Sequence, residues 1–99
     1  MEKRTPHYRL TTVKSMVKTG DVRATASAYQ GARELGIDDL DGMCAVVLAL
    51  APADFHKSMT THADHTVWQD VYRPGTQAGD AYLKLTVIDD VLIVSFKEL

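Results

Sequence analysis

The chain has one cysteine and no long apolar segment, and these two absences exclude several classes of protein. A lone cysteine, Cys44, cannot form an internal disulfide framework, which favours a reducing compartment. Cys44 lies in an apolar run, which is typical of a packing residue rather than a reactive thiol. No stretch approaches the ~20 apolar residues of a membrane span, and the first residues, MEKRTPHY, lack the apolar region of a signal peptide. We therefore expect a cytoplasmic protein that makes no use of membranes.

The sequence also lacks a large excess of charge of one sign. It has 11 Lys and Arg against 13 Asp and Glu, which gives a net charge of −2 at pH 7. This balance argues against a broadly basic nucleic-acid-binding protein, but it allows a local basic patch. The 99 residues are enough for one domain, residues 1–99, with one modest hydrophobic core.

The segment 82–99 carries the clearest pattern, because apolar and polar residues alternate on both sides of Asp89 and Asp90. This alternation predicts two antiparallel strands joined by a two-residue turn. On the apolar side the predicted pairs are Leu83–Phe96, Leu85–Val94 and Val87–Leu92. On the other side the predicted pairs are Tyr82–Lys97 and Lys84–Ser95. One face of this hairpin is thus apolar, and the other is suited to a ligand that carries phosphate.

Helical patterns come first in the chain and strand patterns follow. Thr5–Pro6 predicts the start of a helix that Gly20 ends, and a second helix is expected from about Thr25 or Ser27 to Leu35. A third segment, GMCAVVLALA, can be capped by Asp41; its alanines favour a buried helix, although its valines also fit a strand. HKSMTT and TVWQDVYR read as strands that a short loop joins. Helices followed by an antiparallel sheet predict an α+β two-layer domain, with helices covering one sheet face.

The strand registers decide which residues share the uncovered face. Trp68 and Tyr72 fit the packed face, and simple closure of the PGTQAG loop places 71 opposite 82 and 69 opposite 84. A three-residue loop, 62–64, would set Lys57 opposite Gln69. A four-residue loop would set Lys57 opposite Asp70 on the packed side, where an unshielded lysine is costly. We favour the first register, and we expect Asp70 to bond backbone or a helix end.

The open face is then predicted to carry several cations together with two polar residues and no acidic partner. Its expected members are Lys57, Gln69, Arg73, Tyr82, Lys84 and Lys97. A solvated outer face with ordinary charges is one explanation, since polar outer faces are common in antiparallel sheets. All the charged residues of this face are positive, and Tyr82 and Gln69 lie among them, which favours a functional site.

Four runs of residues, MEKRTPH, DGMC, FHKSMTTHADHTVWQDVYRP and YLKLTVIDDVLIVSFKEL, closely resemble the MqsR family of mRNA interferase toxins. The resemblance extends over nearly the whole chain and implies a RelE-like α+β fold. It implies metal-independent, sequence-selective cleavage of single-stranded mRNA at GC-containing sites such as GCU, without a cofactor. It also implies a zinc-containing, DNA-binding MqsA-type antitoxin, and contact with operator DNA only through the antitoxin complex.

The family's site residues can be carried over onto matching motifs of this chain. The resemblance implies catalytic roles for Lys57 in KSMTT, Gln69 in WQDVYRP, Tyr82 in YLK, and Lys97. The expected substrate-binding residues are His56, Met59, Arg73 and Lys84. His56 departs from the family pattern, which has tyrosine there, and the segment GIDDLDGM is one residue longer than usual.

Cleavage that uses the 2′-hydroxyl of RNA as nucleophile needs a base, an acid and stabilisation of phosphate charge. With no carboxylate expected on the face, Lys57 or Tyr82 would transfer protons unless His56 contributes. For His56 we favour simple replacement of an aromatic residue over a titrating role. His62 and His65 lack the four ligands of a structural zinc site, so no metal site is expected. The alternative function is a noncatalytic RNA-binding or protein-interaction module that uses the same face.

Overall fold

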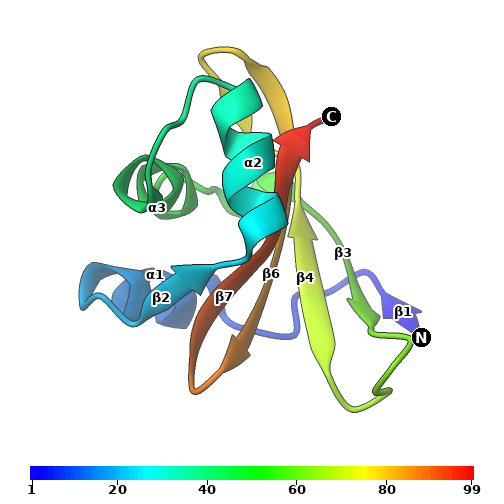
Figure 1. Ribbon diagram of the computed structural model, residues 1–99. Coiled ribbons are helices and arrows are strands. Elements are labelled where there is room, and N and C mark those ends of the chain that lie inside the picture. The colour runs from blue at the N-terminus through cyan, green and yellow to red at the C-terminus, as the bar shows by residue number, and fades with distance from the viewer.

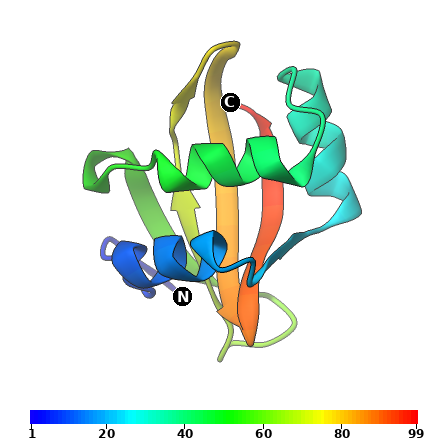
Figure 2. The same cartoon turned by 90° about the vertical axis from the view of Figure 1, so that its left-hand side faces the viewer.

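The computed structural model describes residues 1–99 and places three α-helices on one side of a seven-stranded sheet (Figures 1 and 2). The helices are α1 (Leu10–Lys18), α2 (Ala26–Glu34) and α3 (Leu40–Leu48). The sheet strands, in spatial order, are β1 (Glu2–Lys3), β3 (Phe55–Thr60), β4 (Trp68–Tyr72), β6 (Gly79–Ile88), β7 (Asp90–Glu98) and β2 (Val22–Ala24). A further short strand, β5 (Gly75–Thr76), pairs with β6, and only β2 runs parallel to its neighbour, β7. The predicted α+β two-layer architecture is confirmed.

Helix α1 begins later than the sequence predicts. Its N-cap is Arg9, so the expected start at Thr5–Pro6 is wrong. The physical reason is Asp70, whose carboxylate accepts the backbone N–H groups of His7 and Tyr8 at 3.0 Å each. Asp70 is fully buried and bonds backbone, as predicted, and these two hydrogen bonds hold the chain in an irregular path before α1.

The other helix boundaries follow side-chain caps. Thr25 caps α2 by accepting the N–H of Ala28, which confirms Thr25 rather than Ser27 as the start of this helix. The predicted helix in the segment GMCAVVLALA is confirmed as α3. Its cap is Asp39 rather than Asp41, because the Asp39 carboxylate accepts the N–H of Gly42 at 2.8 Å. A side-chain oxygen at the N-cap satisfies an amide that has no partner within the helix. None of the helices has both the length and the apolar character that a membrane-spanning helix needs.

The core lies between the helices and the sheet, and its buried side chains come from all three helices and the central strands. They include Val13, Val17, Ala28, Ala32, Met43, Val47, Tyr72, Leu83, Leu85, Ile93 and Phe96. Helix α2 packs directly on β7, where a Cβ atom on Gly31 would lie 1.8 Å from the carbonyl oxygen of Phe96. The helices therefore bury one sheet face and leave the other uncovered (Figure 1).

The register of the β6–β7 hairpin agrees with the prediction over its first half only. The pairs Tyr82–Lys97, Leu83–Phe96 and Lys84–Ser95 are confirmed. Beyond Lys84 the register shifts, so that the pairs are Leu85–Ile93 and Val87–Val91 rather than Leu85–Val94 and Val87–Leu92. The two-residue turn is also wrong, because Asp90 pairs with Ile88 and only Asp89, with φ of 65°, lies between them. A β-bulge inserts one unpaired residue into a strand, and simple alternation gives no sign of it.

The two other predicted registers are wrong by two residues each. Lys57 pairs with Val71 rather than Gln69, because the β3–β4 connection spans residues 61–67 instead of three residues. Val71 in turn pairs with Lys84 rather than Tyr82. The PGTQAG segment, expected to be a simple loop, contains β5, which pairs with β6. A shift of two residues preserves the face on which a side chain lies, whereas a shift of one reverses it. The predicted open face therefore survives both errors.

Candidate active site on the open sheet face

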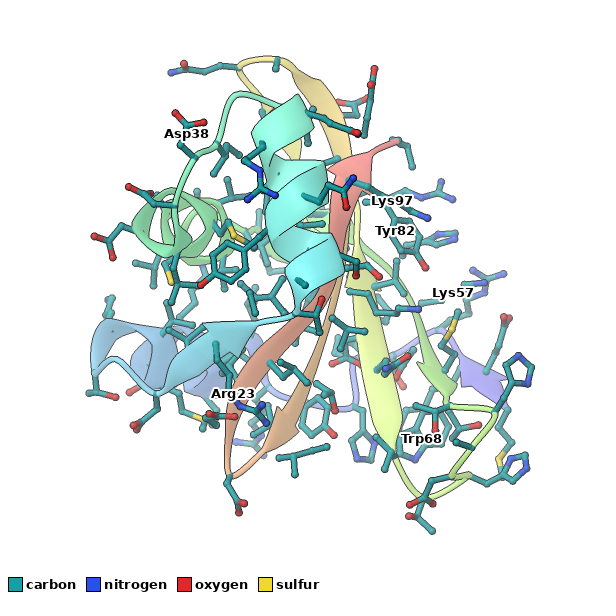
Figure 3. The ribbon with its side chains drawn as sticks, in the orientation of Figure 1. Arg23, Asp38, Lys57, Trp68, Tyr82 and Lys97 are labelled. Carbon is teal, nitrogen blue, oxygen red and sulfur yellow. The ribbon has the colours of Figure 1, made fainter.

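The open sheet face brings together residues from separate strands. Lys57, Val71, Lys84 and Ser95 form one row of Cα partners across β3, β4, β6 and β7. Tyr82 and Lys97 are partners in the adjacent part of the hairpin. Figure 3 shows Lys57, Tyr82 and Lys97 on the side of the sheet opposite the helices. Met59 and Gln69 are also partners, and alternation along β3 and β4 puts them on the same face as Lys57.

Val71 gives this face an apolar centre. It belongs to the open face as predicted, yet it is completely buried. Its strand partners are Lys57 on one side and Lys84 on the other, and opposed side chains on a sheet approach within about 5 Å at Cβ. We infer that the aliphatic stems of both lysines cover Val71 and leave their ammonium groups at the surface. This packing restricts the positions that the two ammonium groups can take.

The hairpin supplies a second group of side chains. The Lys97 ammonium lies 5.0 Å from the centre of the Tyr82 ring, a cation–π arrangement. Burial and the positive charges of Lys97 and Lys57 lower the pKa of Lys84. Burial, together with the nearby like charges, thus disfavours the protonated form of Lys84, so this lysine gives up its proton more readily than an isolated one.

His56 reaches the site through an irregularity in β3. Phe55 pairs with Tyr72 and Lys57 with Val71, so His56 is the extra residue between two paired positions. The Arg73 guanidinium Nη2 donates to His56 Nε2 at 3.1 Å. Partial burial and the charges of Arg73, Arg4 and Lys57 lower the pKa of His56. The neutral imidazole can accept this hydrogen bond from Arg73, which is exposed just beyond β4.

Glu2 is a residue of this face that the sequence reasoning missed. Strand β1 pairs with β3, with Glu2 opposite Met59, and the Glu2 carboxylate Oε1 lies 2.9 Å from Lys57 Nζ. The expectation of no acidic partner on the open face is therefore wrong. The hydrogen bond and charge of Lys57 lower the pKa of Glu2. A strand of two residues has no periodicity, so no sequence pattern indicates where it pairs.

The loop histidines do not join this cluster. His62 and His65 are exposed in the β3–β4 connection. The structure contains no group of three or more His, Cys, Asp or Glu side chains arranged to hold a metal ion. Cys44 is half-buried on α3, and burial and nearby Asp41 raise the pKa of its thiol, which makes the reactive thiolate scarce.

Comparison with known proteins shows what the chain is similar to. A family model described as "Motility quorum-sensing regulator, toxin of MqsA" matches residues 5–98. The chain is also similar to the mRNA interferase toxin MqsR of Escherichia coli (strain K12), with 63% identity over 98 residues that cover 99% of each chain. Both matches include all of the strands β3, β4, β6 and β7 that build the open face.

Proposed function

The chain belongs to the MqsR toxin family, and from this membership and the geometry of the open face we propose that it is an mRNA interferase. In this proposal it is the toxin of a toxin–antitoxin pair and an endoribonuclease of the cytoplasm. It cleaves single-stranded mRNA at GC-containing sites such as GCU, and it needs no metal or other cofactor.

The observation that supports this proposal most is the convergence of cations and a tyrosine on one uncovered face. Lys57, Lys84, Lys97 and Arg73 come from different segments and lie around Tyr82 and the buried Val71. A phosphodiester carries one negative charge in the ground state and more in the transition state of its cleavage. Fixed cations aimed at that charge stabilise the transition state without reorganisation.

The proposed reaction uses the 2′-hydroxyl of the substrate as an internal nucleophile. A base removes its proton, the 2′-oxygen bonds to phosphorus, and the bond from phosphorus to the 5′-oxygen breaks as an acid protonates that oxygen. This route gives a 2′,3′-cyclic phosphate and a 5′-hydroxyl. Lys57 or Tyr82 transfers protons, while Lys97 and Arg73 hold the phosphate. Gln69 contacts a base edge or orients the substrate, flanked by its partner Met59.

Two further residues refine these roles. The lowered pKa of Lys84 adds it to the groups that can exchange a proton, besides binding phosphate. The hydrogen bond from Arg73 already occupies Nε2 of His56, which supports a role in holding Arg73 rather than in proton transfer. The proposal thus gives His56 no part in proton transfer, and its hydrogen bond to Arg73 goes beyond the simple replacement of an aromatic residue expected at position 56.

The proposed partner is an MqsA-type antitoxin that contains zinc and binds DNA. It neutralises the toxin, and operator DNA is contacted only through the complex, which represses the operon. Growth arrest on expression, relieved by co-expression of the antitoxin, would support this part of the proposal.

The catalytic proposal is tested with purified protein and a single-stranded RNA that contains one GCU site, with and without chelator. We expect cleavage at that site in both conditions, and a loss of about 100-fold or more in Lys57→Ala and Tyr82→Phe. Lys18→Ala is a matched control, because Lys18 is exposed on α1, on the other side of the sheet. Full activity in the Lys57 and Tyr82 variants would contradict the assignment, and binding without cleavage would favour the noncatalytic module.

A further inference from the structure

Lys57 is the one cation of the open face that has an acidic partner. The structure contains two ion pairs, Lys57–Glu2 and Arg23–Asp90, and the second joins β2 to the start of β7 away from the site. Figure 3 shows Arg23 far from Lys57, Tyr82 and Lys97. A carboxylate among cations that are meant for phosphate competes with the substrate, so its presence calls for an explanation.

The position of Glu2 is set by backbone pairing rather than by chance contact of a loose segment. Glu2 and Lys3 of β1 pair with Met59 and Ser58 of β3. The carbonyl of Met1 accepts the N–H of Thr60 at 3.0 Å, which extends this pairing by one residue. The Lys57 side chain is only 23% exposed, against 53% for Glu2. The Lys57 ammonium is therefore held against the Glu2 carboxylate in a partly buried position.

We propose, as a deepening of the proposed function, that Glu2 is a positioning residue that holds the Lys57 ammonium where it meets the reacting phosphodiester. A free lysine side chain samples many rotamers, and a fixed carboxylate 2.9 Å from its ammonium removes much of that freedom in advance. Glu2 also places a negative charge beside Lys57, whose positive charge contributes, after burial and the charge of Lys97, to lowering the pKa of Lys84. The N-terminal strand is then part of the active site.

A role for Glu2 as the general base fits the geometry less well. Its Oε1 is already occupied by the Lys57 ammonium. The hydrogen bond and charge of Lys57, with smaller contributions from Arg4 and the N-terminal ammonium, lower the pKa of Glu2 and make it a weaker proton acceptor. Glu2 therefore acts through Lys57 rather than on the substrate.

The first test separates positioning from substrate binding and from general stability. We expect Glu2→Ala to lower kcat about tenfold with KM changed less than about twofold, because a misplaced catalytic group slows the chemical step. Glu2→Gln keeps an oxygen that accepts from Lys57 and should recover most of kcat. Glu34→Ala, an exposed residue of α2, is the matched control and should leave kcat unchanged.

A double-mutant cycle tests whether Glu2 acts through Lys57. Adding Glu2→Ala to Lys57→Ala should cause no further loss of kcat, because coupled residues are not additive. A second, activity-independent measurement is the NMR titration of the Glu2 carboxyl carbon, whose pKa should rise toward its ordinary value in Lys57→Met.

The outcomes distinguish this inference from the proposed function. If the wild type cleaves RNA and Glu2→Ala matches its kcat, or if the two losses add in the double variant, the positioning role is overturned. An unchanged Glu2 titration in Lys57→Met also overturns it, because the pair would then be absent in solution. If the wild type cleaves no RNA, the proposed function fails, whereas a shifted titration still supports the Glu2–Lys57 pair.

Discussion

Asp70 links the sheet to the N-terminal segment through two charge-assisted hydrogen bonds. Each of its carboxylate oxygens accepts one backbone N–H, from His7 and from Tyr8, and the side chain is fully buried. An asparagine has one acceptor oxygen, and its NH₂ group would face the second N–H. We therefore expect Asp70→Asn to lower the free energy of unfolding by about 1–3 kcal/mol, measured by urea denaturation.

The control for this prediction is Asp38→Asn. Asp38 is exposed in the connection before α3, and Figure 3 shows it at the far side of the helices. The same substitution there should change the free energy of unfolding by less than about 0.5 kcal/mol. Equal changes in the free energy of unfolding at the two positions would mean that the two hydrogen bonds of Asp70 do not stabilise the fold.

His56 gives the stability of the protein a dependence on acid pH. Partial burial and the charges of Arg73, Arg4 and Lys57 lower its pKa in the folded state. As pH falls below about 6.5, the unfolded chain takes up a proton at His56 before the folded protein does. The stabilising contribution is therefore present above the unfolded pKa and is lost as pH falls through the folded pKa.

His56→Gln removes this titration. We expect its melting temperature to fall less than that of the wild type between pH 7.5 and pH 5.5, as measured by differential scanning calorimetry. The shift is modest because His56 is only partly buried. Identical falls in both proteins would show that the environment of His56 does not resist protonation.

At the scale of elements, the contact between α2 and β7 depends on a glycine. A Cβ on Gly31 would lie 1.8 Å from the carbonyl oxygen of Phe96 and 2.9 Å from its carbonyl carbon. Gly31→Ala must push α2 away from the backbone of β7, which outweighs the better helix propensity of alanine, about 1 kcal/mol. We expect a net loss of about 2 kcal/mol or more in the free energy of unfolding, measured by urea denaturation.

Gln30→Ala provides the comparison on the same helix. Gln30 is exposed, so this substitution should leave the free energy of unfolding within about 0.5 kcal/mol of the wild type. A stable Gly31→Ala protein with unchanged unfolding would mean that α2 does not approach β7 as closely as the structure shows.

The elements also show which parts of the site were predictable. Tyr82 and Lys97 were paired correctly because a hairpin is local and its alternation is visible in sequence. The pairings of Lys57 and Val71 were each wrong by two residues, because they depend on loop lengths that sequence does not fix. The open face survived these errors because a strand has a period of two.

The unpredicted parts of the site depend on irregular or very short elements. His56 is the extra residue in β3 and lies beside Arg73, and the two-residue strand β1 brings Glu2 beside Lys57. Neither feature has a periodic pattern, and each is decided by tertiary contacts between distant segments. Composition and alternation could therefore identify the face and its cations, but not the contacts that orient them.

At the scale of the whole molecule, the net charge of −2 provides no broad electrostatic attraction to nucleic acid, so the proposed function requires binding to depend on the open face. The cations there are Lys57, Arg73, Lys84 and Lys97, while acidic residues such as Asp38, Asp39 and Asp41 lie in and around the start of α3. Broad attraction to RNA is thus weak, and binding should depend on the few phosphates that contact the open face. That number can be measured from the salt dependence of binding.

For single-stranded RNA, the slope of log Kobs against log salt is about −0.7 for each phosphate neutralised. Contact by all four cations therefore predicts a slope of about −3 with a 2′-O-methyl RNA, which binds but has no nucleophile. Lys97→Ala should reduce the magnitude of the slope by about 0.7, whereas Lys18→Ala, on the helix side, should leave it unchanged. Fluorescence anisotropy at several salt concentrations measures each slope. Equal reductions of the slope in both variants would mean that RNA is attracted by the whole surface, which would contradict binding at the open face.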